Sequence, residues 1–148
     1  MNRRFFIAAA AIVTLPGAAP AAEPEIFTGL VKGVAVGGHD AVSYFKGGEP
    51  QRGEENYAAE WNGASWRFAS QANLDAFKAN PEKYAPQYGG YCAYAVSRGY
   101  TAKGDPEAWT VVDGRLYLNY SLDVRQMWAE DFPGNIAKAN GNWPGVLD

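Results

Sequence analysis

A single thiol is the side chain in this sequence with the greatest chemical reactivity. Cys92 is the only cysteine among 148 residues, and it directly follows Gly89, Gly90 and Tyr91. Because there is no second cysteine, the chain cannot form an intramolecular disulfide. The thiol must therefore be buried and inert, bound to a metal, paired with another molecule, or redox-active. These four alternatives define the functional interpretations that the sequence allows.

Few other side chains could join Cys92 in a metal site. The chain has one histidine, His39, and beyond the initiator one methionine, Met127. A blue-copper centre needs two histidines and a cysteine, so one copy of the chain cannot build it. A zinc site would need Cys92, His39 and two carboxylates, such as Asp40 and an unidentified partner. A low-coordinate Cu(I) site made by Cys92 with His39 or Met127 needs the fewest ligands, so copper is the first choice of metal.

Each of these residues also has a purely structural interpretation. Cys92 resembles a small buried hydrophobic residue beside Tyr91 and Tyr94. His39 follows two glycines and fits a turn, and 53 positions separate it from Cys92, so no short ligand spacing links the two. Met127 fits a core position on a helical stripe with Val124 and Trp128. The surrounding tyrosines are typical of core and interface rings.

An enzymatic role has little support in the sequence. There is no G-x-S-x-G motif, and no candidate nucleophile is tied to a base. A Cys92–His39 pair is the one hydrolase-like or peroxidase-like arrangement that the chain can still form. We therefore expect a binding protein rather than an enzyme, with a thiol redox protein that uses Cys92 and an interaction module with an inert cysteine as the alternatives.

The first 21 residues are typical of an export leader. Arg3 and Arg4 precede an apolar stretch that is too short to span a membrane, and Ala19-Pro20-Ala21 fits a cleavage site. The paired arginines followed by Phe and a large aliphatic residue resemble a twin-arginine signal, which predicts a periplasmic protein. Removal of the leader changes the net charge from -3 to about -5, so nucleic acid and anionic membranes are not expected partners.

The remaining sequence predicts one compact α+β domain over residues 34–145. Two β-hairpins are expected at 57–69 and 109–120, because Asn62-Gly63 and Asp113-Gly114 suit type I′ turns between alternating apolar residues. Helices are expected at 71–79 and 121–131, capped by Ser70 and Ser121. Further expectations are that Leu116, Leu118 and Tyr120 share one face of a strand, and that Pro133-Gly134 interrupts the last helical region.

Several of these segments resemble the YHS domain family. The similarity rests on a D-x-V motif before an aromatic pair, an aromatic strand that ends in F-x-S, and an N-P-E-K-Y motif. The N-P-E-K-Y motif continues into a run that ends in G-G-Y-C-A, and this longer segment is similar to exported, stand-alone YHS-like proteins. The residues are Asp40 to Val42, Tyr44-Phe45, Trp66 to Ser70, Asn80 to Tyr84 and Ala85 to Ala93.

The resemblance implies metal handling, but its ligands are missing. YHS domains fused to copper-transporting ATPases are associated with metal binding through cysteines, and in this chain those three positions hold Ser43, Ala69 and Asn73. The family site therefore cannot be carried over, and Cys92 is the one thiolate left for a metal. The resemblance implies a metal ion or a metal-handling protein as partner. Some exported relatives have selenocysteine at the position of Cys92, which would favour redox chemistry there.

Overall fold

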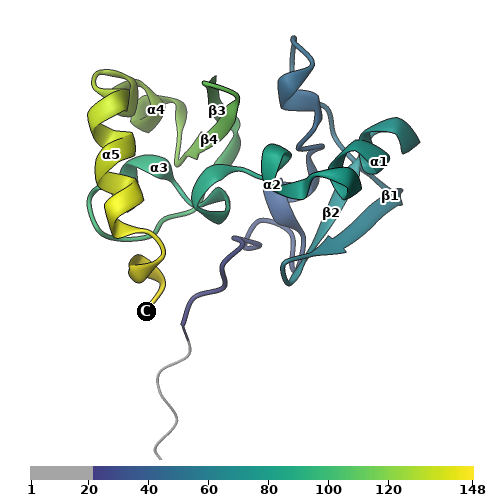
Figure 1. Ribbon diagram of the computed structural model, residues 1–148, viewed down its shortest axis with the longest axis horizontal. Coiled ribbons are helices and arrows are strands. Elements are labelled where there is room, and N and C mark those ends of the chain that lie inside the picture. Colours follow the sequence, from purple (N-terminus) through teal and green to yellow (C-terminus); the bar gives the residue numbers. More distant parts are fainter. Residues whose placement is uncertain (1–21) are drawn as a thin grey trace, which may run out of the picture.

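The computed structural model of the chain describes residues 22–148, so the expected leader lies outside the described residues. Its helices and strands form two halves that lie side by side (Figure 1). In the described part, no helix is both long enough and apolar enough to cross a membrane. The structure confirms an α+β fold with two separate two-stranded antiparallel sheets. The expected domain range of 34–145 stays a prediction.

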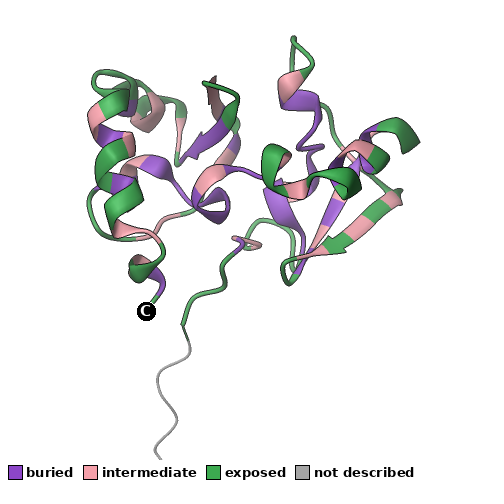
Figure 2. Ribbon diagram, in the orientation of Figure 1, coloured by how far each residue is buried: buried purple, intermediate pink, exposed green. Residues whose placement is uncertain are grey.

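The first half is built on a β-hairpin and the helix that follows it. Strands β1 (Glu54–Trp61) and β2 (Ala64–Phe68) pair antiparallel, with Trp61 opposite Ala64. The register shifts between Glu54 and Ala58. Asn62 and Gly63 both have positive φ, as a type I′ turn requires. On β2, alternate residues are buried, whereas β1 is exposed or half-buried (Figure 2). This hairpin therefore presents one apolar face to the core, as the sequence pattern predicts.

Two helices close the first half. Helix α1 (Gln71–Ala79) begins at Ser70, whose hydroxyl accepts a hydrogen bond from the Asn73 amide at 3.2 Å. This bond satisfies one of the free amides at the start of the helix, as predicted for a serine cap. The short helix α2 (Pro81–Tyr84) follows directly. The core here is aromatic, with the Phe77 ring 4.9 Å from the rings of both Trp66 and Phe68.

The second half repeats the combination of hairpin and helices. Strands β3 (Asp105–Val112) and β4 (Arg115–Asn119) pair across Asp113-Gly114. Helices α3 (Ala93–Ser97) and α4 (Leu122–Ala129) contact these strands, and α5 (Phe132–Asn142) packs against α3 and α4. Ser121 caps α4 through the Val124 amide at 3.1 Å, as expected. The core of the second half is a separate cluster of buried residues, which contains Tyr88, Tyr117, Trp128 and Ala139.

Three details of this half differ from the sequence predictions. Tyr120 lies beyond the end of β4 and is exposed, so it does not share the buried face of Leu116 and Leu118. Met127 is 47% exposed, because α4 turns Trp128 into the core instead. Pro133-Gly134 starts a helix rather than interrupting one: Asp131 caps α5, and proline is tolerated in the first turn.

Contacts between distant segments join the two halves. The Tyr44 hydroxyl donates a hydrogen bond to the Pro106 carbonyl at 2.8 Å, and its ring lies against Trp109. The N-terminal arm runs between the halves, where the Phe27 amide donates to the Gly89 carbonyl at 2.9 Å. These bonds place the segment around Gly89 at the junction of the two halves.

Candidate functional site

Cys92 lies in the second half, where it is the residue that precedes helix α3. Its amide donates to the Ala102 carbonyl at 2.9 Å, and its thiol donates a long hydrogen bond of 3.5 Å to Asn119 Oδ1. The same oxygen accepts from the Tyr94 amide at 3.0 Å. The side chain of Asn119 therefore ties the cysteine to the end of β4. The Nδ2 atom of Asn119 is buried and has no hydrogen-bond partner among the described residues.

The thiol lines an apolar pocket with a volume of about 350 Å³. Although the Cys92 residue is only 1% exposed, the rim of this pocket is open, since Tyr100, Tyr120 and Met127 are each about half exposed. Met127 thus brings a thioether to the same pocket as the thiol. We call this the thiol pocket, and its lining residues are Cys92, Tyr94, Ala95, Tyr100, Ala102, Tyr120, Val124 and Met127.

The surroundings of the thiol keep it protonated at neutral pH. Burial raises the pKa of Cys92, while hydrogen bonds from the backbone amides of Ala95, Tyr120 and Tyr94 act in the opposite direction. Because burial dominates, the net shift is upward. A reactive thiol needs a lowered pKa and access to solvent, and the Cys92 thiol has neither.

This environment predicts slow alkylation of Cys92. We expect iodoacetamide to modify the folded protein at pH 7.5 roughly 100-fold more slowly than the chain unfolded in urea, since only the accessible thiolate reacts. The native rate should rise with pH until it passes the raised pKa. Mass spectrometry of quenched time points measures both rates. Equal rates in the folded and unfolded protein would contradict the burial of the thiol.

His39 is placed by contacts unrelated to the thiol pocket. Its Nε2 atom lies 3.6 Å from the Glu107 carboxylate, and its backbone bridges to Arg52. It is 9% exposed and does not line the thiol pocket. Within residues 22–148, no group of three or more His, Cys, Asp or Glu side chains is placed to hold a metal ion. The structure thus brings Met127, rather than His39, to the pocket of Cys92, and His39 as a ligand stays a prediction.

The three positions that correspond to the cysteines of the metal-binding YHS form meet around one buried carboxylate. Asp40 is completely buried and accepts hydrogen bonds from the Ser43 amide at 3.2 Å, the Ala69 amide at 2.8 Å and Asn73 Nδ2 at 2.7 Å. The Val42 amide adds a fourth bond at 2.9 Å. The residues present do not fit a metal here, because the cluster has no soft ligand and protein donors occupy both carboxylate oxygens. We call this cluster the Asp40 hub.

The structure defines a small α+β fold in which a buried carboxylate organises one half and a thiol pocket lies in the other. Comparison with known families shows that the YHS domain model matches residues 44–88. This segment of the chain is therefore identified as a YHS domain. No curated protein and no solved structure matched the chain. Cys92 and Met127 lie outside the matched residues, so the family match assigns neither of them a role.

Sequence reasoning missed two features of the thiol pocket. Asn119 contacts the thiol, yet in sequence it is only the polar last residue of an apolar strand. Tyr100 and Tyr120 form the rim, but neither follows a pattern that predicts a site. Their exposed rings at the ends of elements were the one available signal, and that signal is weak because isolated exposed aromatics are common.

Proposed function

We propose that this protein is an exported, non-catalytic metal-handling protein that binds one Cu(I) ion in the thiol pocket through Cys92 and Met127. The observation that carries the proposal is that the one cysteine and the one methionine of the described chain line the same pocket. Thiolate and thioether sulfurs are the ligands that Cu(I) prefers, and a soft ion accepts a low coordination number. Zn(II) would require further ligands that the pocket does not supply.

The immediate surroundings of the thiol support a site for a soft ion. The backbone amides of Ala95, Tyr120 and Tyr94 lower the pKa of Cys92 against the effect of burial, so they would favour the thiolate once a metal displaces its proton. The pocket is mostly apolar, which disfavours hard, strongly hydrated ions. Because burial raises the pKa of Cys92, binding must release a proton, and the affinity for Cu(I) should increase with pH up to that pKa.

Anaerobic titration of the protein with Cu(I), against a chromogenic Cu(I) chelator, tests the proposal. We expect about one Cu(I) per chain and no binding by Cys92→Ser. Met127→Leu should weaken binding about tenfold, because the thioether is one of two ligands. His39→Gln is the matched control and should bind as the unchanged protein does.

Each contrary outcome of the titration has a definite meaning. Unchanged stoichiometry in Cys92→Ser would overturn the site. A loss of binding in His39→Gln without a loss in Met127→Leu would replace the proposed ligand pair with Cys92 and His39. If the unchanged protein binds no Cu(I), an interaction module with an inert cysteine becomes the better account. A thiol redox role is the less favoured alternative, since the sulfur is buried and its pKa is raised.

A further inference from the structure

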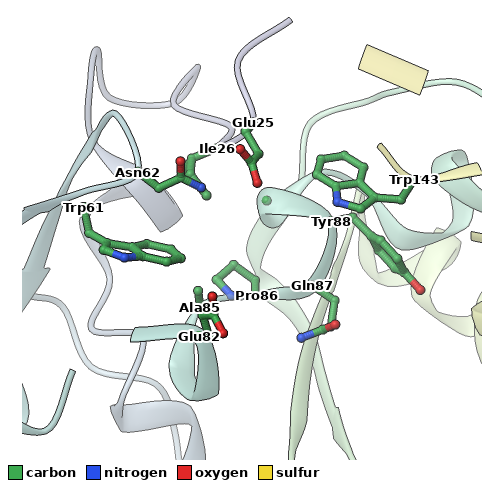
Figure 3. Close-up of a pocket in the computed structure, with 11 residues that line it drawn as sticks. Glu25, Ile26, Trp61, Asn62, Glu82, Ala85, Pro86, Gln87, Tyr88 and Trp143 are labelled. Carbon is green, nitrogen blue, oxygen red and sulfur yellow. The ribbon is translucent and has the colours of Figure 1, made fainter. Parts of the chain in front are cut away.

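A second pocket, distinct from the thiol pocket, lies at the junction of the two halves. It has a volume of about 240 Å³ and is lined by four segments: the N-terminal arm, the β1–β2 turn, the chain from α2 to Gly89, and the indole of Trp143 (Figure 3). None of its lining residues belongs to the thiol pocket. Its size suits a small group rather than an extended ligand.

The lining of this junction pocket carries negative charge and no positive charge. Glu25 and Glu82 contribute two carboxylates, and no lysine, arginine or histidine lines the pocket. Over residues 22–148, neither carboxylate forms a salt bridge. Lys83 and Arg115 line a neighbouring hollow that shares Glu82, and the Lys83 ammonium lies 5.1 Å from the centre of the Tyr84 ring. A ligand in the junction pocket would therefore meet two carboxylates that form no salt bridge within residues 22–148, with the nearest cations in the neighbouring hollow.

Two indole rings flank these carboxylates. Trp61 and Trp143 lie on opposite sides of the pocket, with Glu25 between them on one side and Gln87 on the other (Figure 3). Indole is the aromatic ring that attracts cations most strongly through its face. Charge and aromatic character thus point to the same class of ligand, an organic cation.

The walls of the pocket are held in place before any ligand binds. The Trp61 ring packs edge-on against Trp66 and Phe77, with centroids 5.7 and 5.8 Å away. The Trp143 ring lies 6.0 Å from Tyr88 and 6.1 Å from Tyr91. Rings fixed by their neighbours lose little freedom on binding, which favours affinity.

The arm that carries Glu25 is fixed on both sides of this residue. The Tyr91 hydroxyl donates to the Pro24 carbonyl at 2.7 Å, and the Phe27 amide donates to the Gly89 carbonyl at 2.9 Å. Asn62, which also lines the pocket, belongs to the tight turn between β1 and β2. The carboxylate and amide groups around the pocket are therefore attached to backbone that is already positioned.

We propose that the junction pocket binds a guanidinium group, which stacks on an indole while its N–H groups donate to Glu25 and Glu82. A guanidinium is planar, permanently charged and able to bond a carboxylate through two parallel hydrogen bonds. The amide oxygens of Asn62 and Gln87 offer further acceptors. A neutral polar ligand could use the same acceptors but would leave both carboxylates uncompensated. The group could belong to a free small molecule or to an arginine side chain of a partner protein.

NMR titration of the isotope-labelled protein tests this site. The probes are methylguanidinium, N-acetyl-arginine amide and its neutral isostere N-acetyl-citrulline amide, with the indole N–H signals as readout. We expect both guanidinium probes to shift the Trp61 and Trp143 signals with a Kd of about 1 mM, and the citrulline compound to leave them unchanged. Tighter binding of the arginine compound would identify a peptide side chain as the source, and equal binding a free small molecule.

Charge-neutral variants complete the test. Glu25→Gln and Glu82→Gln should each weaken binding about tenfold, whereas the control Glu60→Gln, on the exposed face of β1, should have no effect. All three positions are exposed, so folding should be preserved, and the other NMR signals verify it. Absence of any shift at about 20 mM probe, or equal binding of the citrulline compound, would overturn the proposal. These outcomes do not depend on Cu(I) binding by the thiol pocket.

Discussion

Replacement of Asp40 by alanine should lower the free energy of unfolding by roughly 4 kcal/mol, enough to unfold much of a domain of ordinary stability. The carboxylate is fully buried and accepts four hydrogen bonds, three from backbone amides and one from Asn73 Nδ2. Its removal leaves these donors buried without an acceptor. Each such group costs about 1–3 kcal/mol, although relaxation of the surrounding residues reduces the sum.

Urea unfolding followed by tryptophan fluorescence measures this effect. Asp75→Asn is the matched control, because Asp75 is an exposed carboxylate on α1 whose one side-chain partner is Gln71. Its substitution should change stability by less than about 0.5 kcal/mol. Asp40→Asn should be nearly as harmful as Asp40→Ala, since an amide places a donor toward other donors. A loss below about 1 kcal/mol for both Asp40 variants would show that the hub does not hold this half together.

The Asp40 hub also illustrates what the sequence can and cannot predict. The D-x-V motif, the F-x-S strand and the capped helix were each recognised as separate signals. The sequence does not show that these segments converge on one carboxylate. Residues 40, 69 and 73 meet through tertiary packing, which no local sequence pattern encodes. In the sequence, Ser43, Ala69 and Asn73 stand out only because they replace metal-binding cysteines. In the structure, these positions supply hydrogen-bond donors instead of ligands.

Local structure is predictable from the sequence where the residue types themselves determine the backbone conformation. Asn62-Gly63 and Asp113-Gly114 adopt positive φ in both hairpins, because these residue types tolerate that conformation. The prediction of a break at Pro133-Gly134 is wrong: α5 starts at Phe132, because proline fits the first turn of a helix that Asp131 caps. Periodicity places Tyr120 on the face of Leu116 and Leu118 and Met127 in the core. However, β4 ends at Asn119, just before Tyr120, and α4 turns Trp128 rather than Met127 into the core.

The candidate sites were predictable only in part. Cys92, His39 and Met127 followed from an inventory of soft ligands, but the choice between the last two depended on the fold. Nothing in the sequence places Met127, 35 positions after Cys92, in the same pocket. The junction pocket has even less of a signature, because its two indoles and two carboxylates come from four separate segments. Such a site becomes visible only when the chain is folded.

Substitution of Gly89 by alanine should have the second large effect, a loss of at least about 3 kcal/mol in the free energy of unfolding. Gly89 has a φ of +63°, a conformation that costs an alanine about 1–2 kcal/mol. In addition, a Cβ atom here would overlap the carbonyl oxygen of Glu25, which is backbone and cannot rotate away. The arm would have to move, and the hydrogen bond from the Phe27 amide to Gly89 would be lost.

Gly99→Ala separates these two costs. Gly99 has a φ of +89°, but nothing lies within 4 Å of the Cβ that would be added, so only the conformational cost of about 1 kcal/mol is expected. The difference between the two variants in urea unfolding therefore measures the steric clash with the arm. Deletion of residues 22–27 provides the decisive comparison: without the arm, Gly89→Ala should cost no more than Gly99→Ala. If the cost of Gly89→Ala stays high in the truncated protein, the clash with Glu25 is not its cause, and the close packing of the arm does not depend on a glycine at this position.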